Sequence, residues 1–84
     1  MSQQPFFDHA SSSVRFWVQI DAHWVAASIR KEVLHYYYRP DAQGEDPMET
    51  YRSHRDDIEA AVRQRIAQGA REPVMVRETD LPPP

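Results

Sequence analysis

The clearest pattern in the chain is an alternation of apolar and polar residues from Val14 to Ile20. Side chains in a strand point alternately to the two faces of a sheet, so this pattern predicts a half-buried strand. Val14, Phe16, Val18 and Ile20 share the apolar face, and the opposite face carries Arg15, Trp17 and Gln19.

A two-residue turn at Asp21-Ala22 is expected to join this strand to a second one over residues 23–27. In that register Gln19 lies opposite Trp24. Trp17 and Trp24 then become diagonal neighbours on the face that points away from the core.

Two helical patterns follow the predicted hairpin. Residues 29–38 carry an inward stripe at helical spacing and end before Pro40. The second helix starts at Asp46-Pro47, because Asp suits the N-cap position and Pro suits the first helical position. It runs to about Gln68, and Gly69 follows its end. Its inward stripe is Tyr51, Ile58, Val62 and Ile66.

A third strand is expected from Val74 to Arg77, which gives the order ββααβ. This order predicts an α+β fold of two layers, with two helices on one face of a small antiparallel or mixed sheet. Residues 14–81 form the single domain in this interpretation. Residues 1–13 are expected to be a flexible tail, apart from the apolar pair Phe6-Phe7, and residues 82–84 a proline tail.

Several short groups of residues between 14 and 81 follow a dispersed pattern. They are Val14 and Phe16, the turn at Asp21-Ala22, Ile29 with Glu32-Val33-Leu34, the long-helix residues Tyr51, Arg55, Ile58 and Val62, and finally Asp80-Leu81. This pattern resembles a bacterial family known only as the domain of unknown function 1488. The resemblance implies the fold and adds no chemistry. Ala22 and Arg30 depart from it, since the family favours Gly at the turn and a capping Ser or Thr before the helix.

Composition removes several classes of function. The chain has 84 residues, a formal net charge of −3, two glycines and no cysteine. These values disfavour nucleic-acid binding by bulk charge, a glycine-rich phosphate loop and any thiol or Cys-based zinc chemistry. The four histidines lack the i, i+4 spacing of a helical metal site, and no Ser–His–Asp set is visible. We therefore expect no metal, no cofactor, no catalytic residues and no enzymatic activity. Without a signal sequence or an apolar stretch long enough to span a bilayer, a cytoplasmic protein away from membranes is expected.

The charges of the long helix fit a solvated face. Asp56, Asp57 and Glu59 alternate with arginines at helical spacing. Arg55 differs, because it is four residues after Tyr51 and therefore on the inward stripe. It is interpreted as a structural arginine bound to a loop carbonyl or to Asp80, with an anion-binding arginine as the alternative.

The candidate interaction surface consists of Arg15, Trp17, Gln19 and Trp24. A sheet face with two tryptophans is too apolar to remain in water, so the tail with Phe6 and Phe7, a second copy, or a bound peptide or nucleic acid should cover it. We expect a non-catalytic accessory module that forms a homodimer or binds a protein partner through this face. The alternative is a nucleic-acid-binding regulator that uses this face together with the nearby Arg15, Arg30, Lys31 and Arg39. The negative net charge of the chain disfavours this alternative.

Overall fold

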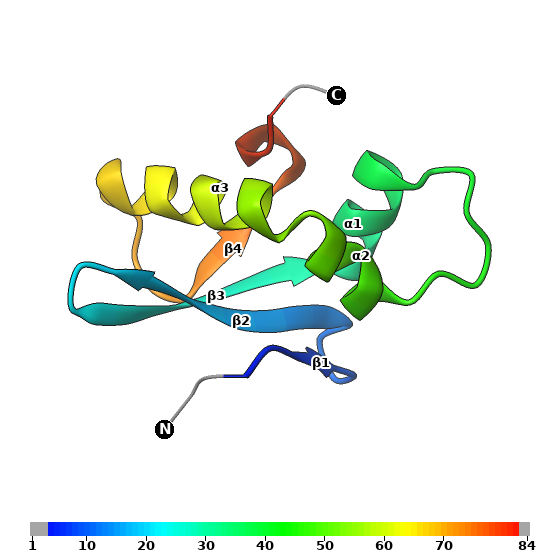
Figure 1. Cartoon of the computed structure of the whole chain (residues 1–84), viewed down its shortest axis with the longest axis horizontal. Coiled ribbons are helices and arrows are strands. Elements are labelled where there is room, and N and C mark those ends of the chain that lie inside the picture. Colours follow the sequence, from blue (N-terminus) through cyan, green and yellow to red (C-terminus); the bar gives the residue numbers. More distant parts are fainter. Residues whose placement is uncertain (1–3, 83–84) are drawn as a thin grey trace.

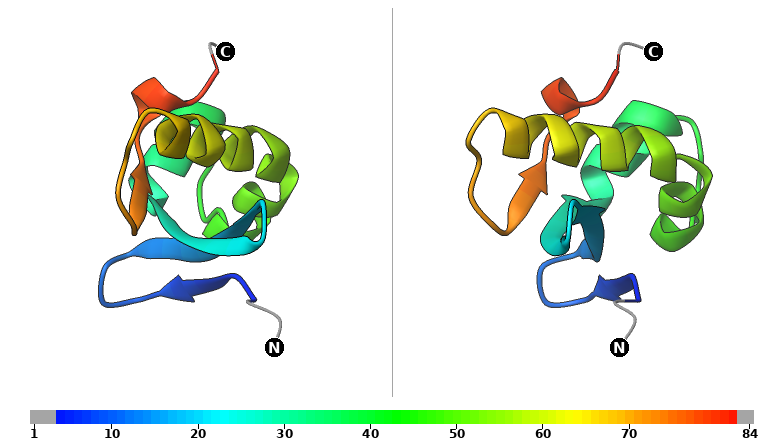
Figure 2. Two further views of the ribbon diagram at one scale, coloured as in Figure 1. Left: turned by 90° about the vertical axis from the view of Figure 1, so that its left-hand side faces the viewer. Right: turned by 60° about the vertical axis from the view of Figure 1, so that its left-hand side comes forward.

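The structure, a computed structural model, describes residues 4–82 as one mixed sheet covered on one side by helices (Figures 1 and 2). The strands are β1 (Phe6–Asp8), β2 (Ser13–Ile20), β3 (His23–Arg30) and β4 (Val74–Val76), in the sheet order β1-β2-β3-β4. The helices are α1 (Lys31–Tyr38), α2 (Pro47–Ser53), α3 (Arg55–Ala67) and the short 3-10 helix η1 (Glu78–Asp80). The α+β class, the two layers and the one-sided helices are confirmed. The order is βββαααβ, so the expected ββααβ lacked one strand and one helix.

The β2–β3 hairpin has the predicted register, with Gln19 opposite Trp24. Of the two central turn residues only Asp21 has a positive φ, at 55°. Aspartate tolerates this left-handed conformation, so Ala22 closes the turn without the glycine of the related pattern. The second strand is longer than residues 23–27, because it continues to Arg30.

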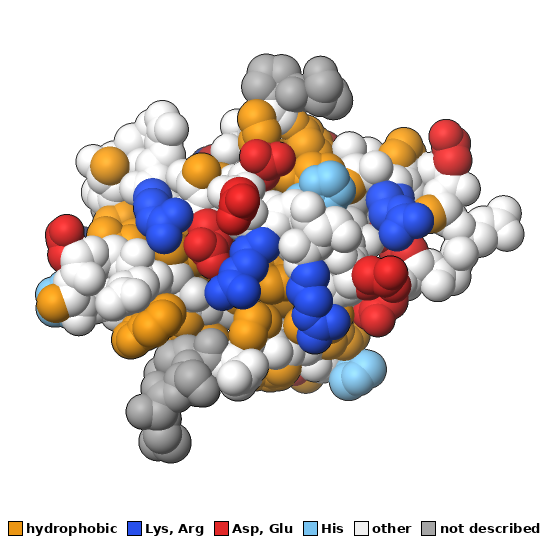
Figure 3. All heavy atoms as spheres, in the orientation of Figure 1, with side chains coloured by type: hydrophobic (Ala, Val, Ile, Leu, Met, Phe, Trp, Pro, Cys, Tyr) orange, Lys and Arg blue, Asp and Glu red, His pale blue; other side chains and the backbone are white. Residues whose placement is uncertain are grey.

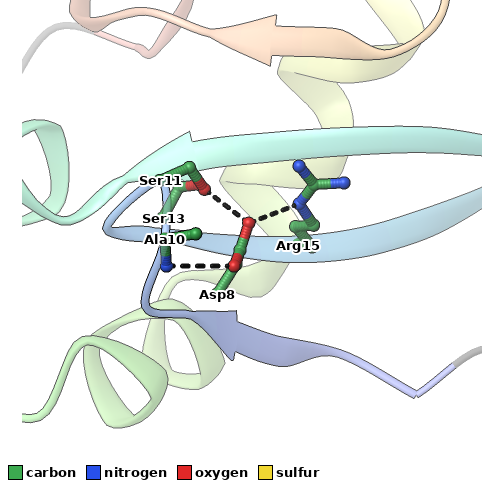
Figure 4. A network of polar contacts seen from close by, with 5 residues as sticks. All are labelled: Asp8, Ala10, Ser11, Ser13 and Arg15. Carbon is green, nitrogen blue, oxygen red and sulfur yellow. Dashed lines mark hydrogen bonds and ion pairs between the residues drawn. The ribbon is translucent and has the colours of Figure 1, made fainter.

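Strand β1 corrects the prediction of a flexible tail over residues 1–13. Phe6 to Asp8 pair antiparallel with β2 at the edge of the sheet, with Phe7 packed at the margin of the core. The serine run that suggested disorder forms the connecting turn, because Asp8 accepts hydrogen bonds from Ala10 N and Ser11 Oγ at 3.2 and 2.8 Å (Figure 4). The ordered domain thus begins at β1. Residues 1–3 and 83–84 lie outside the described residues.

Helix α1 begins at Lys31, two residues later than expected, because Ile29 belongs to β3 and is fully buried. Its inward face is as predicted: Leu34 is completely buried and Tyr36 is 65% exposed.

The predicted long helix is broken at His54, where φ is −120° and ψ is 23°. The His54 ring stacks on the Tyr38 ring with a centroid distance of 3.7 Å and an interplanar angle of 10°. Asp46 caps the first part by accepting from Met48 N at 3.0 Å, as expected. The second part ends at the expected glycine, since Gly69 has a φ of +93° and the next residue closes the helix onto Arg65 O.

The core lies between the apolar face of the β2–β3 hairpin and the stripe of α2 and α3. Phe16 contacts Tyr51 with a ring-centroid distance of 5.0 Å, and the stripe residues Ile58 and Val62 are completely buried. No helix in the described part of the chain is long and apolar enough to cross a membrane.

Strand β4 joins β3 in parallel, with Val74 beside Ala27 and Val76 beside Ile29. Its outer edge is held by Arg65 from α3, whose Nη1 donates to Met75 O at 3.2 Å and to Asp80 Oδ2 at 2.8 Å. The same guanidinium thus fixes the edge strand and the segment after it to the helical layer.

The loop between α1 and α2 is held by one carboxylate. Glu45 Oε1 lies 2.6 Å from His35 Nδ1, and Glu45 Oε2 accepts from the buried Thr50 Oγ1 at 2.6 Å. Burial raises the pKa of Glu45, but the hydrogen bonds from Thr50 and His35 outweigh it, so its pKa lies below the ordinary 4.5.

We expect this contact to make stability depend on acid. A carboxyl group with a lowered folded-state pKa stabilises the fold above its unfolded pKa, and this contribution disappears as the pH falls through the folded pKa. Glu45→Gln should therefore have a shallower loss of unfolding free energy below pH 4.5 than the unsubstituted chain. Urea denaturation at a series of pH values measures both slopes, and parallel slopes would contradict the prediction.

Candidate interaction surface

The face of the sheet that points away from the helices carries the four residues of the predicted surface. Arg15, Trp17, Gln19 and Trp24 project from β2 and β3 on this side, which we call the open face. Figure 2 shows α1, α2 and α3 all on the opposite side of the sheet. The register places Phe6 and Arg30, both named in the sequence analysis, on this face as well, and it adds Ala26, Ser28 and Met75, which were not assigned from the sequence.

The open face exposes large apolar side chains on three of its strands. Trp24, Met75 and Phe6 are 49%, 48% and 46% exposed. The Phe6 ring lies against the Trp17 ring at a centroid distance of 6.1 Å. The N-terminal segment therefore covers one tryptophan in part, while the other remains open to solvent.

A hollow of about 300 Å³ lies on the open face over β3. Two small residues, Ala26 and Ser28, line it, and their cross-strand neighbours Trp17 and Met75 flank them. Arg30 closes the hollow at the end nearest α1. Because small side chains lie between large ones, this part of the face can accept an apolar side chain from outside.

The two arginines of the open face differ in their partners. Arg15 Nε lies 3.1 Å from Asp8 Oδ2, within the turn network of Figure 4. The Ser11 hydroxyl hydrogen bond is the largest influence on Asp8 and holds the pKa of its carboxyl below the usual value. Arg30 is exposed, and within residues 4–82 it has no ion-pair partner. The hollow therefore has one cation free for an external group.

The opposite end of the open face is acidic. Asp21 is exposed at the hairpin turn. A second carboxylate, Glu72, lies beside the middle of β3, where its Oε1 accepts from Ala26 N at 2.7 Å. Neither carboxylate has an ion-pair partner among the described residues. The face is thus polar at its two ends with opposite sign, and apolar between them.

The basic residues grouped in the nucleic-acid hypothesis are not gathered on one surface. Arg15 and Arg30 line the same hollow, whereas Lys31 lines another one, beside His35 and Glu45 of the α1–α2 region. Lys31 is therefore separated from the two arginines of the open face.

Arg55 is not the buried structural arginine that the sequence indicated. Its side chain is 54% exposed and its Nε donates to Glu59 Oε2 at 2.8 Å, four residues further along α3. The bond to Asp80 is made by Arg65 instead. Arg55 follows the break at His54, so the four-residue spacing from Tyr51 does not place both on one face. Arg65 comes seven residues after Ile58 on the same unbroken helix, a spacing that places both on one helical face. This spacing could have identified Arg65 as the structural arginine.

A cavity of about 600 Å³ lies between α3 and η1, and its basic lining residues have structural partners. Arg65 and Arg77 line it and both bind Asp80, so their charges are already used. Of the acidic residues on α3, Glu59 is paired as expected, because it lies 2.8 Å from Arg55 and 3.7 Å from Arg63, whereas Asp56 and Asp57 form no ion pair among the described residues. Figure 3 shows basic and acidic side chains intermingled over this layer. Within residues 4–82 no group of three or more His, Asp or Glu side chains is placed to hold a metal ion.

Comparison with known proteins agrees with the fold. The chain resembles a structure described as a protein of unknown function from the DUF1488 family of Shewanella loihica PV-4, with a TM-score of 0.70 and 20% sequence identity. The similarity covers 92% of this chain and 96% of that one. No curated protein matches the chain. The family described as "Protein of unknown function (DUF1488)" matches residues 2–76, which is most of the sequence. The chain therefore belongs to the DUF1488 family, as its dispersed residue pattern suggested.

Proposed function

We propose that this protein is a non-catalytic interaction module that self-associates as a homodimer through the open face. The observation that carries the proposal is the exposure of Trp24, Met75 and Phe6 on one uncovered side of the sheet. An apolar patch framed by polar residues marks a protein–protein contact. A two-fold dimer buries the patch of both copies at once, because each copy presents the same surface.

The dimensions of the open face suit a small interface. The eight residues of β2 and of β3 extend about 27 Å, and four strands set about 4.8 Å apart are about 19 Å wide. Strands β1 and β4 have three residues each, so the contact area is at the low end for specific interfaces, about 600 Å² per partner. We therefore expect a dimer with a dissociation constant in the micromolar range.

The non-catalytic part of the proposal is supported by the positions of the titratable groups. The carboxyl groups with lowered pKa values are Asp8, Glu45 and Asp80, and each accepts hydrogen bonds that fix a turn or a loop. Perturbed groups at an active site would instead converge on one cavity. These three lie in three separate networks.

Nucleic-acid binding remains the second candidate, because Trp17, Arg15 and Arg30 line one hollow. Aromatic and basic side chains together can stack and neutralise a single strand. The net charge of −3 and the pairing of Arg15 with Asp8 count against it. A salt-dependent change in fluorescence anisotropy with a labelled oligonucleotide would favour this candidate over self-association.

Dimer formation is expected to require Trp24. Sedimentation equilibrium or native mass spectrometry of the untagged chain should show a monomer–dimer equilibrium, and Trp24→Lys should shift it to the monomer at least tenfold, since a charge would be buried in the contact. Because Trp24 is half-exposed and outside the core, the substitution should leave the melting temperature nearly unchanged.

Tyr36→Lys is the matched control, since Tyr36 is exposed on the helical side and outside the open face. It should dimerise like the unsubstituted chain. A chain that stays monomeric up to millimolar concentration, or a Trp24→Lys variant that dimerises normally, would refute the proposal.

A further inference from the structure

We infer that Trp24 of each copy inserts into the hollow of the other, in a dimer whose two-fold axis runs across the strands. This inference rests on the proposed self-association and specifies its geometry. It follows from three features of the open face: a protruding indole at one end, a hollow of about 300 Å³ toward the other end, and opposite charges at the two ends.

The proposed axis passes through the midpoint of the β2–β3 ladder, where two copies overlap most fully. The ladder runs from the pair Ser13–Arg30 to the pair Ile20–His23, so its midpoint on β3 lies between Ala26 and Ala27. Trp24 is 2.5 residues from that midpoint, about 8–9 Å along the strand. A two-fold rotation about an axis across the strands places it the same distance beyond the midpoint on the partner, between Ser28 and Arg30.

That position is the hollow. Ser28 and Arg30 line it, and Met75 and Trp17 flank it. An indole entering there replaces water over Ser28 with contacts to Met75 of β4 and to Arg15 of β2, the two cross-strand neighbours of Ser28. A packed aromatic anchor of this kind dominates small interfaces. The unpaired Arg30 guanidinium at the end of the hollow is placed to contact the face of the entering ring.

The charges select this axis over the other one. A two-fold axis along the strands would bring Arg30 of one copy toward Arg30 of the other and would leave both hollows empty. An axis across the strands brings the Arg30 end of each copy to the hairpin end of the other, where Asp21 is exposed. The axis across the strands therefore places Arg30 near Asp21 at both ends of the contact, whereas the axis along the strands places two Arg30 side chains near each other. Like charges in a contact oppose association, so the axis across the strands is favoured.

Two substitutions test the insertion by complementation. Trp24→Ala removes the inserted side chain, and Ser28→Leu fills the hollow; each should weaken dimerisation by about tenfold or more. Ser28→Ala is the matched control at the same position, because it leaves the hollow open, and it should change the dissociation constant by less than about threefold. Both changes lie on the open face, so melting temperatures verify that the fold is intact.

The decisive experiment mixes the two weakened variants. In the heterodimer, the intact Trp24 of the Ser28→Leu chain meets the open hollow of the Trp24→Ala chain. The other contact pairs the filled hollow of the Ser28→Leu chain with the small Ala. Neither homodimer contains an intact Trp24 facing an open hollow. Native mass spectrometry separates the three species by mass, and the heterodimer should exceed its random share. A heterodimer at its random share, or equal effects of Ser28→Leu and Ser28→Ala, would overturn the insertion while leaving self-association in place. A monomeric unsubstituted chain would overturn the proposed function itself.

Discussion

Replacing Phe16 with alanine is expected to lower the free energy of unfolding by about 3–5 kcal/mol. Phe16 is completely buried and its ring contacts Tyr51, so it joins the central strand of the sheet to α2. A domain of this size has only about 5 kcal/mol of stability, because its core is small. Most of the variant should therefore be unfolded at 37 °C, as measured by circular dichroism and urea denaturation at lower temperature.

Phe6→Ala is the control for this experiment. The same side chain is removed, but Phe6 is 46% exposed on the open face. Its loss should cost less than about 1 kcal/mol. Comparable losses of stability for the two variants would show that the core does not lie where the structure places it.

Arg65→Met is expected to be the most destabilising change of a surface charge, at about 2 kcal/mol. Burial by itself raises the pKa of Asp80, but the hydrogen bonds from Arg77 N and the Arg65 guanidinium hold the pKa of that carboxyl below its usual value. Removing Arg65 leaves Asp80, whose side chain is 9% exposed, without its shortest charged contact. It also frees the outer edge of β4 at Met75 O.

Arg55→Met provides the comparison on the same helix. Arg55 pairs only with Glu59 along α3 and is 54% exposed, so its loss should cost about 0.3–0.5 kcal/mol. Urea denaturation of both variants measures the difference. If Arg55→Met were the more destabilising substitution, the sequence-based interpretation of Arg55 would be correct and the contacts described here for Arg65 would be wrong.

Strand alternation predicted side-chain positions more reliably than helical spacing did. The alternation from Val14 to Ile20 determines the two faces of the hairpin, because each residue's face depends only on its nearest neighbours along the strand. The surface of Arg15, Trp17, Gln19 and Trp24 was therefore predictable. Helical spacing is less robust, since one irregular residue rotates everything that follows.

His54 is that residue. Its own side chain is compatible with a helix, and the break coincides with stacking on Tyr38, a contact from another helix that no local pattern contains. Strand β1 was missed for a similar reason. Three residues beside a serine run carry little strand signal, and the pairing with β2 depends on the turn that Asp8 organises.

The hollow could not be predicted either. Its small residues, Ala26 and Ser28, are unremarkable in the sequence, and Met75 reaches the open face only because β4 adds to the sheet beside β3. What the sequence offered was the exposed Trp24. The site that we propose for this side chain needed the three-dimensional register.

The position of β4 has a consequence for how the chain acquires its structure. The β1, β2 and β3 meander is made of contacts between residues close in sequence, whereas Ala27 and its partner Val74 are 47 positions apart. At about 5–20 residues per second, a ribosome needs about 2–9 s to add the residues between Arg30 and Val76. During that interval the edge of β3 that will receive β4 is unpaired, and an unpaired strand edge can pair with another chain. The meander is therefore the part of this protein most in need of protection from premature association while it is being made.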